Sequence, residues 1–431
     1  MKEVEDPRFP ELITYDKCFL LWWGLSLFLF HLGSRRQLDY QLNTDGPNVL
    51  DNLNRLAGTK QETRPVNKTL NNFLGKIGSQ PIANLRTLMI RRLIRMKVLE
   101  RARLQGHWVV AVDATGLFVF HERHCEHCLT RTHGETTTYM HQVLEAKLLG
   151  PAGTVFSVGS EFIDNRDAPV DATPEQHKQD CELKALSRLA PALKAIFPQL
   201  PICLSGDGLY ACGRLLAIAE VHGWKYVVTL KPGRLPTVWQ EFQTLLEQCP
   251  DQHVVQVTPR GVRQVYRWMH DLTYTDSAGR TWTFTGVQCV ETRPDGSATT
   301  WAWLTNLEVN HDTVIEVATK GGRHRWHVEN QGFNAQKNGG LNLEHAYSHR
   351  EPQWPAYYYL LQIAHMILQL LEKGSLLRNL AAEQGKTFKQ LFGSLKNLVE
   401  RLRESVRFLW WPEQVFDPAA TGQIQIRLDT S

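Results

Sequence analysis

The chain has 431 residues, of which 42% are hydrophobic and 21% are charged, and its formal net charge at pH 7 is +4. These values are ordinary for a globular protein, so the chain is expected to bury a sizeable hydrophobic core. Its length predicts two or three domains. Eight cysteines at irregular spacing, without a secretory signal, fit a reducing compartment better than a disulfide framework. We therefore expect a cytoplasmic protein.

The first predicted element is an apolar run at residues 18–33, CFLLWWGLSLFLFHLG. It is shorter than the roughly 20 apolar residues that a membrane span needs, and it contains His31. The segment before it is acidic and contains proline, so it lacks the basic n-region of a signal peptide, and no small-residue cleavage site follows. We predict a buried helix here, and membrane association is the less favoured alternative.

Residues 1–107 are predicted to be mostly helical, and a long run at 82–104 has apolar side chains at helical spacing. Between positions 86 and 103 this run has one acid, Glu100, and seven basic residues: Arg86, Arg91, Arg92, Arg95, Lys97, Arg101 and Arg103. A basic helix can be a solvated surface, yet this concentration of charge favours contact with DNA phosphates. We therefore predict a helical DNA-binding domain at 1–107, in which Arg91, Arg92 and Arg95 contact DNA.

From residue 108 onward, strands and helices are predicted to alternate. Two strands end at an aspartate, Asp113 in HWVVAVDATG and Asp207 in PICLSGDGLY. The other predicted elements are a hairpin partner at 117–124, strands at 140–149, 154–163 and 224–231, and helices at 175–197 and 214–222. Residues 233–308 are rich in Thr, Val, Trp and Tyr with turn signals between them, which predicts a β-rich insertion. Residues 351–431 are predicted to be helical.

A stretch rich in cysteine and histidine interrupts this order. Cys125 and Cys128 have the spacing of a zinc knuckle, and four histidines lie nearby in the sequence: His121, His124, His127 and His133. One Cys-x-x-Cys pair is a weak signal, so a structural zinc ion and a surface loop between strands both remain open.

The segment at 321–340, GGRHRWHVENQGFNAQKNGG, is predicted to be one helix opened by a Gly pair and closed by another. Arg325 and Glu329 are four residues apart, so both project from the same face of this helix. With Asp113 and Asp207, Glu329 forms a set of hard oxygen ligands that can hold two divalent cations, Mg²⁺ or Mn²⁺. Two ions about 4 Å apart activate the attacking oxygen of a phosphodiester reaction and stabilise the leaving oxygen.

Each of these acids also has a purely structural alternative. An aspartate at a strand end often forms a turn, and a lone glutamate on a helix is usually solvated. Four other acids compete with Glu329 as the third ligand: Glu161, Asp180, Glu182 and Glu344. Glu344 is expected beyond the helix, and Glu161 could support the site from a strand end. Asp180 and Glu182 flank a cysteine before the second aspartate, where a salt bridge is the alternative, so Glu329 is preferred.

Several stretches resemble the DDE transposases of bacterial insertion sequences, in the group with a Tyr-Arg-Glu-Lys signature on the helix that carries the third acid. They are VDATG around Asp113, SGDGLYA around Asp207, and RWHVEN with the downstream GFNAQKN around Glu329. LGSRRQLDYQL, YMHQVLEAKL, KQDCE and LNLEHAYSH also match one branch of that group, so the resemblance covers roughly residues 20–370.

The resemblance implies an α/β ribonuclease-H-like catalytic core at 108–232 and 309–350, interrupted by the β-rich insertion at 233–308. It implies that Asp113, Asp207 and Glu329 bind the metal ions and that Arg325 contacts phosphate. It further implies a homodimer that binds paired transposon ends through the helical N-terminal domain.

This chain departs from the signature at two positions. Gly322 stands where the signature has its Tyr, and Gln336 stands seven residues after Glu329, where it has its Lys. Lys337 follows one residue later, which on a regular helix turns its side chain about 80° away from the expected face. Because a lysine side chain is long, we still expect Lys337 to contact DNA. Trp326 is more often a packing residue at such a place, although it could stack on an unpaired base.

These features together predict metal-dependent cleavage of double-stranded DNA at transposon terminal repeats, followed by strand transfer into target DNA. Two alternatives remain open. One is a stand-alone nuclease with the same core, which hydrolyses DNA but never joins it. The other is a non-catalytic DNA-binding derivative, against which the presence of all three acids argues.

Overall fold

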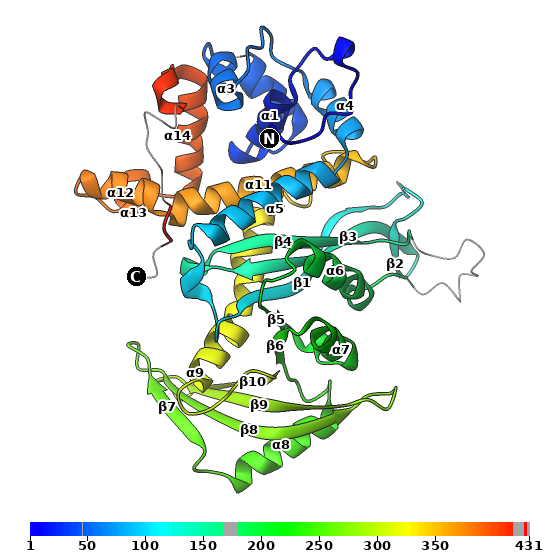
Figure 1. Ribbon diagram of the computed structural model, residues 1–431, viewed down its shortest axis with the longest axis vertical. Coiled ribbons are helices and arrows are strands. Elements are labelled where there is room, and N and C mark those ends of the chain that lie inside the picture. Colours follow the sequence, from blue (N-terminus) through cyan, green and yellow to red (C-terminus); the bar gives the residue numbers. More distant parts are fainter. Residues whose placement is uncertain (45, 124, 167–178, 417–425, 429–431) are drawn as a thin grey trace.

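The computed structural model describes residues 1–44, 46–123, 125–166, 179–416 and 426–428. A helical body, a β-sheet with helices against it, and a strand-rich end follow one another along the long axis (Figure 1). The described residues form one mixed sheet of ten strands, in the order β2-β3-β1-β5-β6-β10-β9-β8-β7, and β4 also pairs with β3. The chain is therefore an α/β protein, as predicted.

The helical body contains the chain before the first strand, which is mostly helical as predicted. Its α-helices are α1 (Lys17–Leu29), α2 (Arg35–Asp39), α3 (Val49–Ala57), α4 (Asn67–Ile77) and α5 (Gln80–Arg95). The apolar run forms α1, which is buried along nearly its whole length; the Asp16 side chain caps it by accepting a hydrogen bond from the Cys18 backbone N–H at 2.6 Å. In the part of the chain that the structure describes, no helix combines the length and apolar character needed to cross a membrane.

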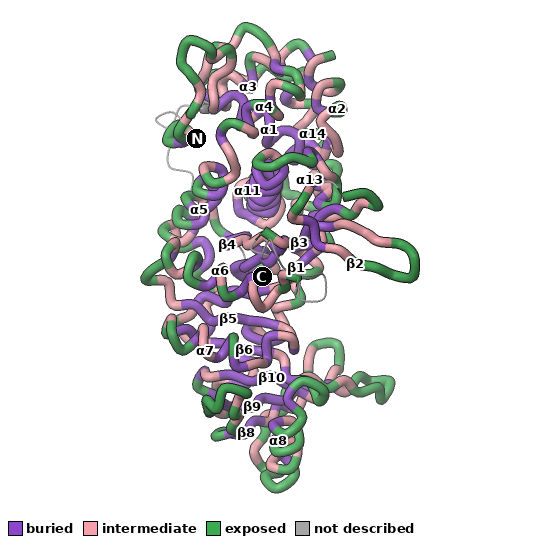
Figure 2. The backbone as a smooth tube through the Cα atoms, turned by 90° about the vertical axis from the view of Figure 1, so that its right-hand side faces the viewer, coloured by how far each residue is buried: buried purple, intermediate pink, exposed green. Residues whose placement is uncertain are grey.

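The C-terminal helices belong to the same body. They are α11 (Gln353–Lys373), α12 (Ser375–Glu383), α13 (Phe388–Phe392) and α14 (Leu395–Phe408). Helix α11 is buried between α1 and the sheet (Figure 2). Asn52 of α3 donates to the carbonyl oxygens of Val406 and Leu409, at 3.0 and 2.6 Å, and so holds the end of α14. The N-terminal and C-terminal helical regions, which the sequence separates by more than 240 residues of other structure, thus share one core.

The centre of the molecule is built on strands β1 (Trp108–Phe120), β3 (Thr136–Leu149), β4 (Val155–Ile163), β5 (Ile202–Gly206) and β6 (Lys225–Thr229). β1, β5 and β6 are parallel neighbours, whereas β3 is antiparallel to β1 and β4 is antiparallel to β3. Alternate side chains of β1 belong to two hydrophobic cores, one on each face of the sheet. Val110 belongs to the core that contains α6 (Glu182–Ile196) and α7 (Gly213–His222), and Ala111 belongs to the core that contains α1 and α11. Burial on both faces explains why this strand is apolar without alternation.

Three predicted boundaries in this region were wrong. β1 does not end at Asp113 but continues to Phe120, because residues 114–120 pair with β3; residues 117–120 therefore belong to the same strand and not to a hairpin partner. The basic helix ends at Arg95, after which Lys97 takes a left-handed φ of 56°. The helix predicted at 175–197 begins at Glu182, and residues 175–178 lie outside the described residues.

The insertion at 233–308 is rich in strands, as predicted, and begins with one helix, α8 (Pro236–Gln248). Its strands are β7 (His253–Val257), β8 (Arg263–Thr275), β9 (Thr281–Thr292) and β10 (Ala298–Thr305). β10 pairs antiparallel with β6. The insertion is therefore a continuation of the central sheet, and α8 packs against β8 (Figure 1).

The segment that carries Glu329 is longer and less regular than predicted. Helical backbone runs from Val314 to Asn338, and π-type turns occupy Val317–Gly322 and Val328–Asn334. The Gly pair at 321 and 322 does not open this helix but lies inside it. A Cβ on Gly321 would lie 2.6 Å from Val227 of β6, and one on Gly322 would overlap the Trp303 ring of β10. These glycines are needed because the helix packs directly onto the sheet.

Candidate active site

Asp113 and Asp207 lie at the same edge of the sheet because of the register of two parallel strands. The pairing of β1 with β5 ends at Ala111 and Ser205, and each aspartate follows two residues later in the chain, Asp113 within β1 and Asp207 directly after β5. Neighbouring strands are about 4.8 Å apart, so equal steps beyond a paired position bring two side chains close together. The prediction that both aspartates end a strand holds for Asp207 only; its side chain accepts from the Leu209 backbone N–H at 2.8 Å.

The helix that carries Glu329 is fixed to this edge by one buried hydrogen bond. Ser205 Oγ, on the last residue of β5 that pairs with β1, donates to the Gly321 carbonyl oxygen at 2.7 Å. Four residues later, Arg325 Nη1 donates to Asp113 Oδ2 at 3.0 Å. Glu329 is exposed one turn further on. The helix therefore crosses the end of β5 and the middle of β1, where Arg325 meets Asp113.

Three carboxylates and one guanidinium act on the charge of Asp113. Burial raises the pKa of Asp113 to about 6; the Arg325 charge lowers this pKa, whereas the charges of Asp207, Glu182 and Glu329 raise it. Because Coulombic interactions weaken with distance, the three acids must lie near Asp113. The structure thus brings together Asp113, Asp207, Glu329 and Arg325, and adds Glu182.

Glu182 was considered only as a rival and as a salt-bridge partner, but it faces the carboxylate cluster. It is the first residue of α6, and its Oε2 accepts from the buried Tyr210 hydroxyl at 3.0 Å. Burial raises the pKa of Glu182, the Tyr210 hydrogen bond lowers it, and the charge of Asp207 raises it. The sequence contained one indication of this role: Glu182 begins the helix that directly precedes β5, the strand that leads to Asp207.

The other rival acids are engaged elsewhere. Arg188 lies 2.6 Å from both Glu161 and Asp180, so the salt-bridge alternative holds for Asp180. Glu344 lies beyond the helix, as predicted, and pairs with Lys337 at 2.8 Å.

Lys337 has its shifted position because the helix is not regular. A π-type turn takes up one residue more than an α-turn, and Val328–Asn334 is such a turn. Seven residues after Glu329, Gln336 is fully buried and donates to Gln362 at 2.8 Å. Lys337, the next residue, is partly exposed.

Trp326 follows Arg325 directly and is 56% exposed. Its ring stacks on that of His327, with centroids 5.9 Å apart. The exposed indole does not fit the packing interpretation, and one of its surfaces is open to solvent.

The basic helix α5 lies away from the carboxylates. Arg91, Arg92 and Arg95 are exposed, but Arg91 Nη2 donates to the Ile196 carbonyl oxygen at 2.6 Å. Ile196 ends α6, whereas Glu182 begins it, and a helix of 15 residues is about 20 Å long. Arg91 therefore lies at the far end of α6 from Glu182 and the carboxylate cluster.

Arg86 does not belong to the exposed basic surface. Its side chain is buried, and Nη1 donates to Ser157 Oγ and Ser160 Oγ at 2.8 and 2.6 Å. The helix face that could meet phosphates thus starts at Arg91.

Cys125 and Cys128 are brought together with His141 of β3, a histidine that the sequence analysis did not select. Among the described residues, His121, His127 and His133 are not part of this group. His124 lies outside the described residues. His141 is 13 residues from Cys128, so only the pairing of β2 (Leu129–His133) with β3 brings it back.

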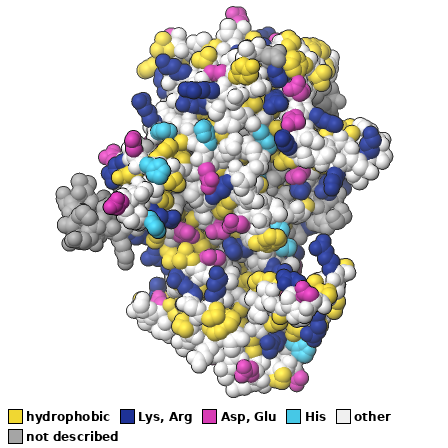
Figure 3. All heavy atoms as spheres, turned by 180° about the vertical axis from the view of Figure 1, so that it is seen from behind, with side chains coloured by type: hydrophobic (Ala, Val, Ile, Leu, Met, Phe, Trp, Pro, Cys, Tyr) yellow, Lys and Arg dark blue, Asp and Glu magenta, His cyan; other side chains and the backbone are white. Residues whose placement is uncertain are grey.

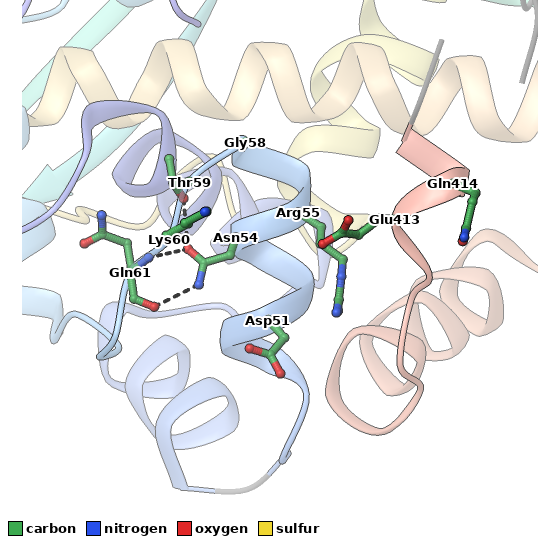
Figure 4. Close-up of a pocket in the computed structure, with 9 residues that line it drawn as sticks. All are labelled: Asp51, Asn54, Arg55, Gly58, Thr59, Lys60, Gln61, Glu413 and Gln414. Atoms are coloured by element: carbon green, nitrogen blue, oxygen red, sulfur yellow. Dashed lines mark hydrogen bonds between the residues drawn. The ribbon is translucent and has the colours of Figure 1, made fainter. Parts of the chain in front are cut away.

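The cavity in Figure 4 is separate from the carboxylates. It has a volume of about 740 Å³ and lies in the helical body, between α3 and residues 413–414. Asn54 bridges its wall by hydrogen bonds with Thr59 and Gln61 (Figure 4). Acidic Asp51 and basic Lys60 both line it, and no residue of the carboxylate cluster does.

No protein-family model matches this sequence, and no curated protein matches it either.

Proposed function

We propose that this protein is a DDE transposase, which cleaves the ends of a transposon and joins them to target DNA with the help of two Mg²⁺ or Mn²⁺ ions. The observation that carries the proposal is the equal step of Asp113 and Asp207 beyond the paired residues Ala111 and Ser205, with Glu329 near Asp113. Acids just beyond the paired residues of two adjacent parallel strands, with an acid from a later helix nearby, form a cluster that suits hard divalent cations.

The strand order supports a ribonuclease-H-like core. Three antiparallel strands in chain order, β1, β3 and β4, are followed by two parallel ones, and the spatial order is β4-β3-β1-β5-β6. This is the arrangement expected from the resemblance. The additional β2 hairpin and the four strands after β6 attach at the two edges of this unit.

The donor set of the cluster fits the proposed metal ions. Four carboxylates and one guanidinium leave an excess of negative charge, which favours binding of a cation. Asp113, Asp207 and Glu329 would hold the ions, which supply Lewis acidity to the attacking and leaving oxygens of the phosphodiester. Glu182, held by Tyr210, would accept hydrogen bonds from water at the rim of the site.

The remaining side chains of the helix are suited to holding DNA. Arg325 presents a planar guanidinium, which binds phosphate oxygens in pairs. The exposed Trp326 indole is suited to stacking on an unpaired base. Lys337 would contact the backbone after its ion pair with Glu344 opens.

The proposed partner is double-stranded DNA, both as terminal repeats and as target. Lys and Arg side chains lie above and below a group of acidic side chains near the middle of one face (Figure 3). The arginines of α5 would bind the terminal repeat, and Arg91 lies at the end of α6 that is about 20 Å from Glu182, so recognition and cleavage would use different parts of one duplex. Two copies of the chain, one on each end, would form the active assembly.

The test uses labelled DNA from the two flanks of the gene that encodes this chain. Purified protein is incubated with this DNA and with Mg²⁺, Mn²⁺ or neither. Metal-dependent nicking at the end boundary, lost in Glu329→Gln while binding persists, is the expected result. Glu400→Gln is the matched control because Glu400 is exposed on α14, in the helical body and outside the cluster.

The alternatives give different products. A stand-alone nuclease would cut but would not join pre-cleaved ends to target DNA. A DNA-binding derivative would bind the ends and would not cut them with either metal.

A further inference from the structure

Three metal-binding side chains meet at the base of the β2 hairpin, away from the carboxylates. Cys125 and Cys128 lie in the turn between β1 and β2, and His141 lies on β3. Cys125 Sγ is 3.3 Å from Cys128 Sγ and 3.1 Å from His141 Nε2, and Cys128 Sγ is 3.9 Å from His141 Nε2. Two sulfurs and one imidazole nitrogen therefore point at a common centre.

These distances are close to those of a tetrahedral zinc site. Zn–S bonds of about 2.3 Å and Zn–N bonds of about 2.05 Å place two sulfurs about 3.8 Å apart and a sulfur and a nitrogen about 3.5 Å apart. The three observed separations differ from these values by about 0.5 Å or less. Small side-chain rotations would bring all three atoms to bonding distance from one ion.

The surroundings hold the three ligands in place. His141 is fully buried, and its ring packs against the rings of Phe118 and Trp354, with centroids 5.5 and 5.0 Å away. Asn165, just after β4, donates through Nδ2 to the Cys128 carbonyl oxygen at 3.0 Å. Asn165 N–H also donates to the His127 carbonyl oxygen at 2.9 Å. The turn that carries the cysteines is thus attached to β4, while the histidine comes from β3.

We propose that Cys125, Cys128 and His141 bind a zinc ion that fixes the β1–β2 turn to the central sheet. Thiolate and imidazole ligands select zinc over Mg²⁺ or Ca²⁺, which prefer oxygen. The three side chains leave one coordination position for a fourth ligand. The ion lies on the far half of β1: His141 faces the bulge between Gly116 and Val119, about 15 Å along the strand from Asp113.

This zinc ion would act on the architecture of the site and not on its chemistry. β3 leads from His141 to Glu145, the residue that pairs with Asp113 in the sheet. An ion that ties the turn to β3 would hold β1 straight beyond Asp113, where the bulge otherwise interrupts its pairing.

The test measures the metal content of the full-length protein and needs no DNA. Protein purified from zinc-supplemented cells and passed over a desalting column is expected to contain one zinc per chain by mass spectrometry. Cys128→Ser and His141→Ala should each lose most of this zinc. Cys249→Ser and Cys181→Ser, which alter exposed cysteines outside the group, should keep it.

A second measurement uses wild-type protein only, so the test does not depend on whether the variants fold. Wild-type protein is refolded with Co²⁺ in place of zinc, and its absorption spectrum is recorded. Thiolate-to-cobalt charge transfer together with the intense visible bands of tetrahedral Co²⁺ is expected. Wild-type protein without zinc and without this spectrum, or zinc that remains in Cys128→Ser, would overturn the assignment. Loss of DNA cleavage with zinc retained would count against the transposase proposal alone.

Discussion

Arg325 Nη1 lies 3.0 Å from Asp113 Oδ2, so the cation of the helix is bound to an acid of the first strand. Both side chains are mostly covered, with 24% and 20% of their surface exposed. The ion pair joins two residues that are 212 positions apart in the chain. It neutralises only part of the cluster, because three further carboxylates raise the pKa of Asp113. Five predictions follow from this balance and from its surroundings.

Asp113→Asn should abolish cleavage and yet raise the thermal stability of the metal-free protein. The folded pKa of Asp113, about 6, lies above the ordinary value of 3.8. Its ionisation therefore costs stability increasingly from about pH 4 to about pH 6, and the full cost is present at pH 8. This cost already includes the favourable charge of Arg325. The Asn variant escapes it, so its melting temperature at pH 8 should be a few degrees higher.

Adding Mn²⁺ gives the control for this prediction. The metal should raise the melting temperature of the wild type and leave that of Asp113→Asn nearly unchanged. Equal shifts in both proteins would show that the metal binds elsewhere.

Glu182→Gln should shift the pH dependence of cleavage to lower pH. The charge of Glu182 raises the pKa of Asp113, and the neutral amide removes this effect while its oxygen still accepts from Tyr210. The measurement is metal-dependent nicking from pH 5 to pH 9. Asp180→Asn is the matched control: it breaks the contact with Arg188 but should leave the profile in place. An unchanged profile in Glu182→Gln would remove Glu182 from the site.

Arg325→Ala should have the opposite effect on pH dependence. Without the guanidinium, the pKa of Asp113 rises above about 6, so metal-induced stabilisation should begin at higher pH than in the wild type. Cleavage should fall about 100-fold, because a phosphate contact is lost as well. Arg325→Lys keeps the charge and should restore the pH profile but only part of the rate.

Gln336→Lys restores the expected spacing of the signature and should nevertheless damage the protein. Gln336 is fully buried and shares Gln362 with the buried Lys147, so a second ammonium would lie in the core without a counter-ion. We expect a loss of about 3 kcal/mol in the free energy of unfolding, measured by urea titration.

The contrasting variant is Lys337→Ala. The partly exposed ion pair with Glu344 contributes little stability. This variant should therefore unfold like the wild type and bind DNA less tightly. A stable Gln336→Lys protein with raised activity would contradict the role given to the π-type turn.

Arg92→Ala/Arg95→Ala should weaken binding to DNA ends by reducing the number of phosphate contacts. Each lost contact lowers the slope of log K against log salt by about 0.9, so the double variant should lose nearly two units of slope. Cleavage at saturating DNA should be retained, because these residues lie far from the carboxylates. Arg86→Ala should instead lose stability, since Arg86 is buried against Ser157 and Ser160.

Much of the local structure could be predicted from the sequence. The apolar α1, the strands β3 to β6 and the helix α7 all have a periodicity that depends on nearby residues. Asp207 follows β5 directly, as expected from the SGDG turn. Local propensity and burial are enough to define such elements, because their hydrogen bonds or apolar faces repeat within a few residues.

Only the tertiary structure decided where elements end and which side chains meet. β1 continues past Asp113 because β3 supplies hydrogen-bond partners, and the insertion joins the sheet because β10 pairs with β6. The Gly pair lies inside its helix because Val227 and Trp303 leave no space for a Cβ. Each of these outcomes depends on residues brought together from distant parts of the chain, and sequence periodicity reports only on near neighbours.

The same contrast between local and distant contacts applies to the residues of the candidate sites. Asp113, Asp207 and Glu329 could be selected in the sequence because each stands in a recognisable local context. Glu182 was only one of several rival acids in the sequence, and His141 had no such context, because their partners Tyr210 and Cys125 are recruited by packing and strand pairing. The sequence by itself thus determined the chemistry that is available, whereas the fold decided which groups share one site.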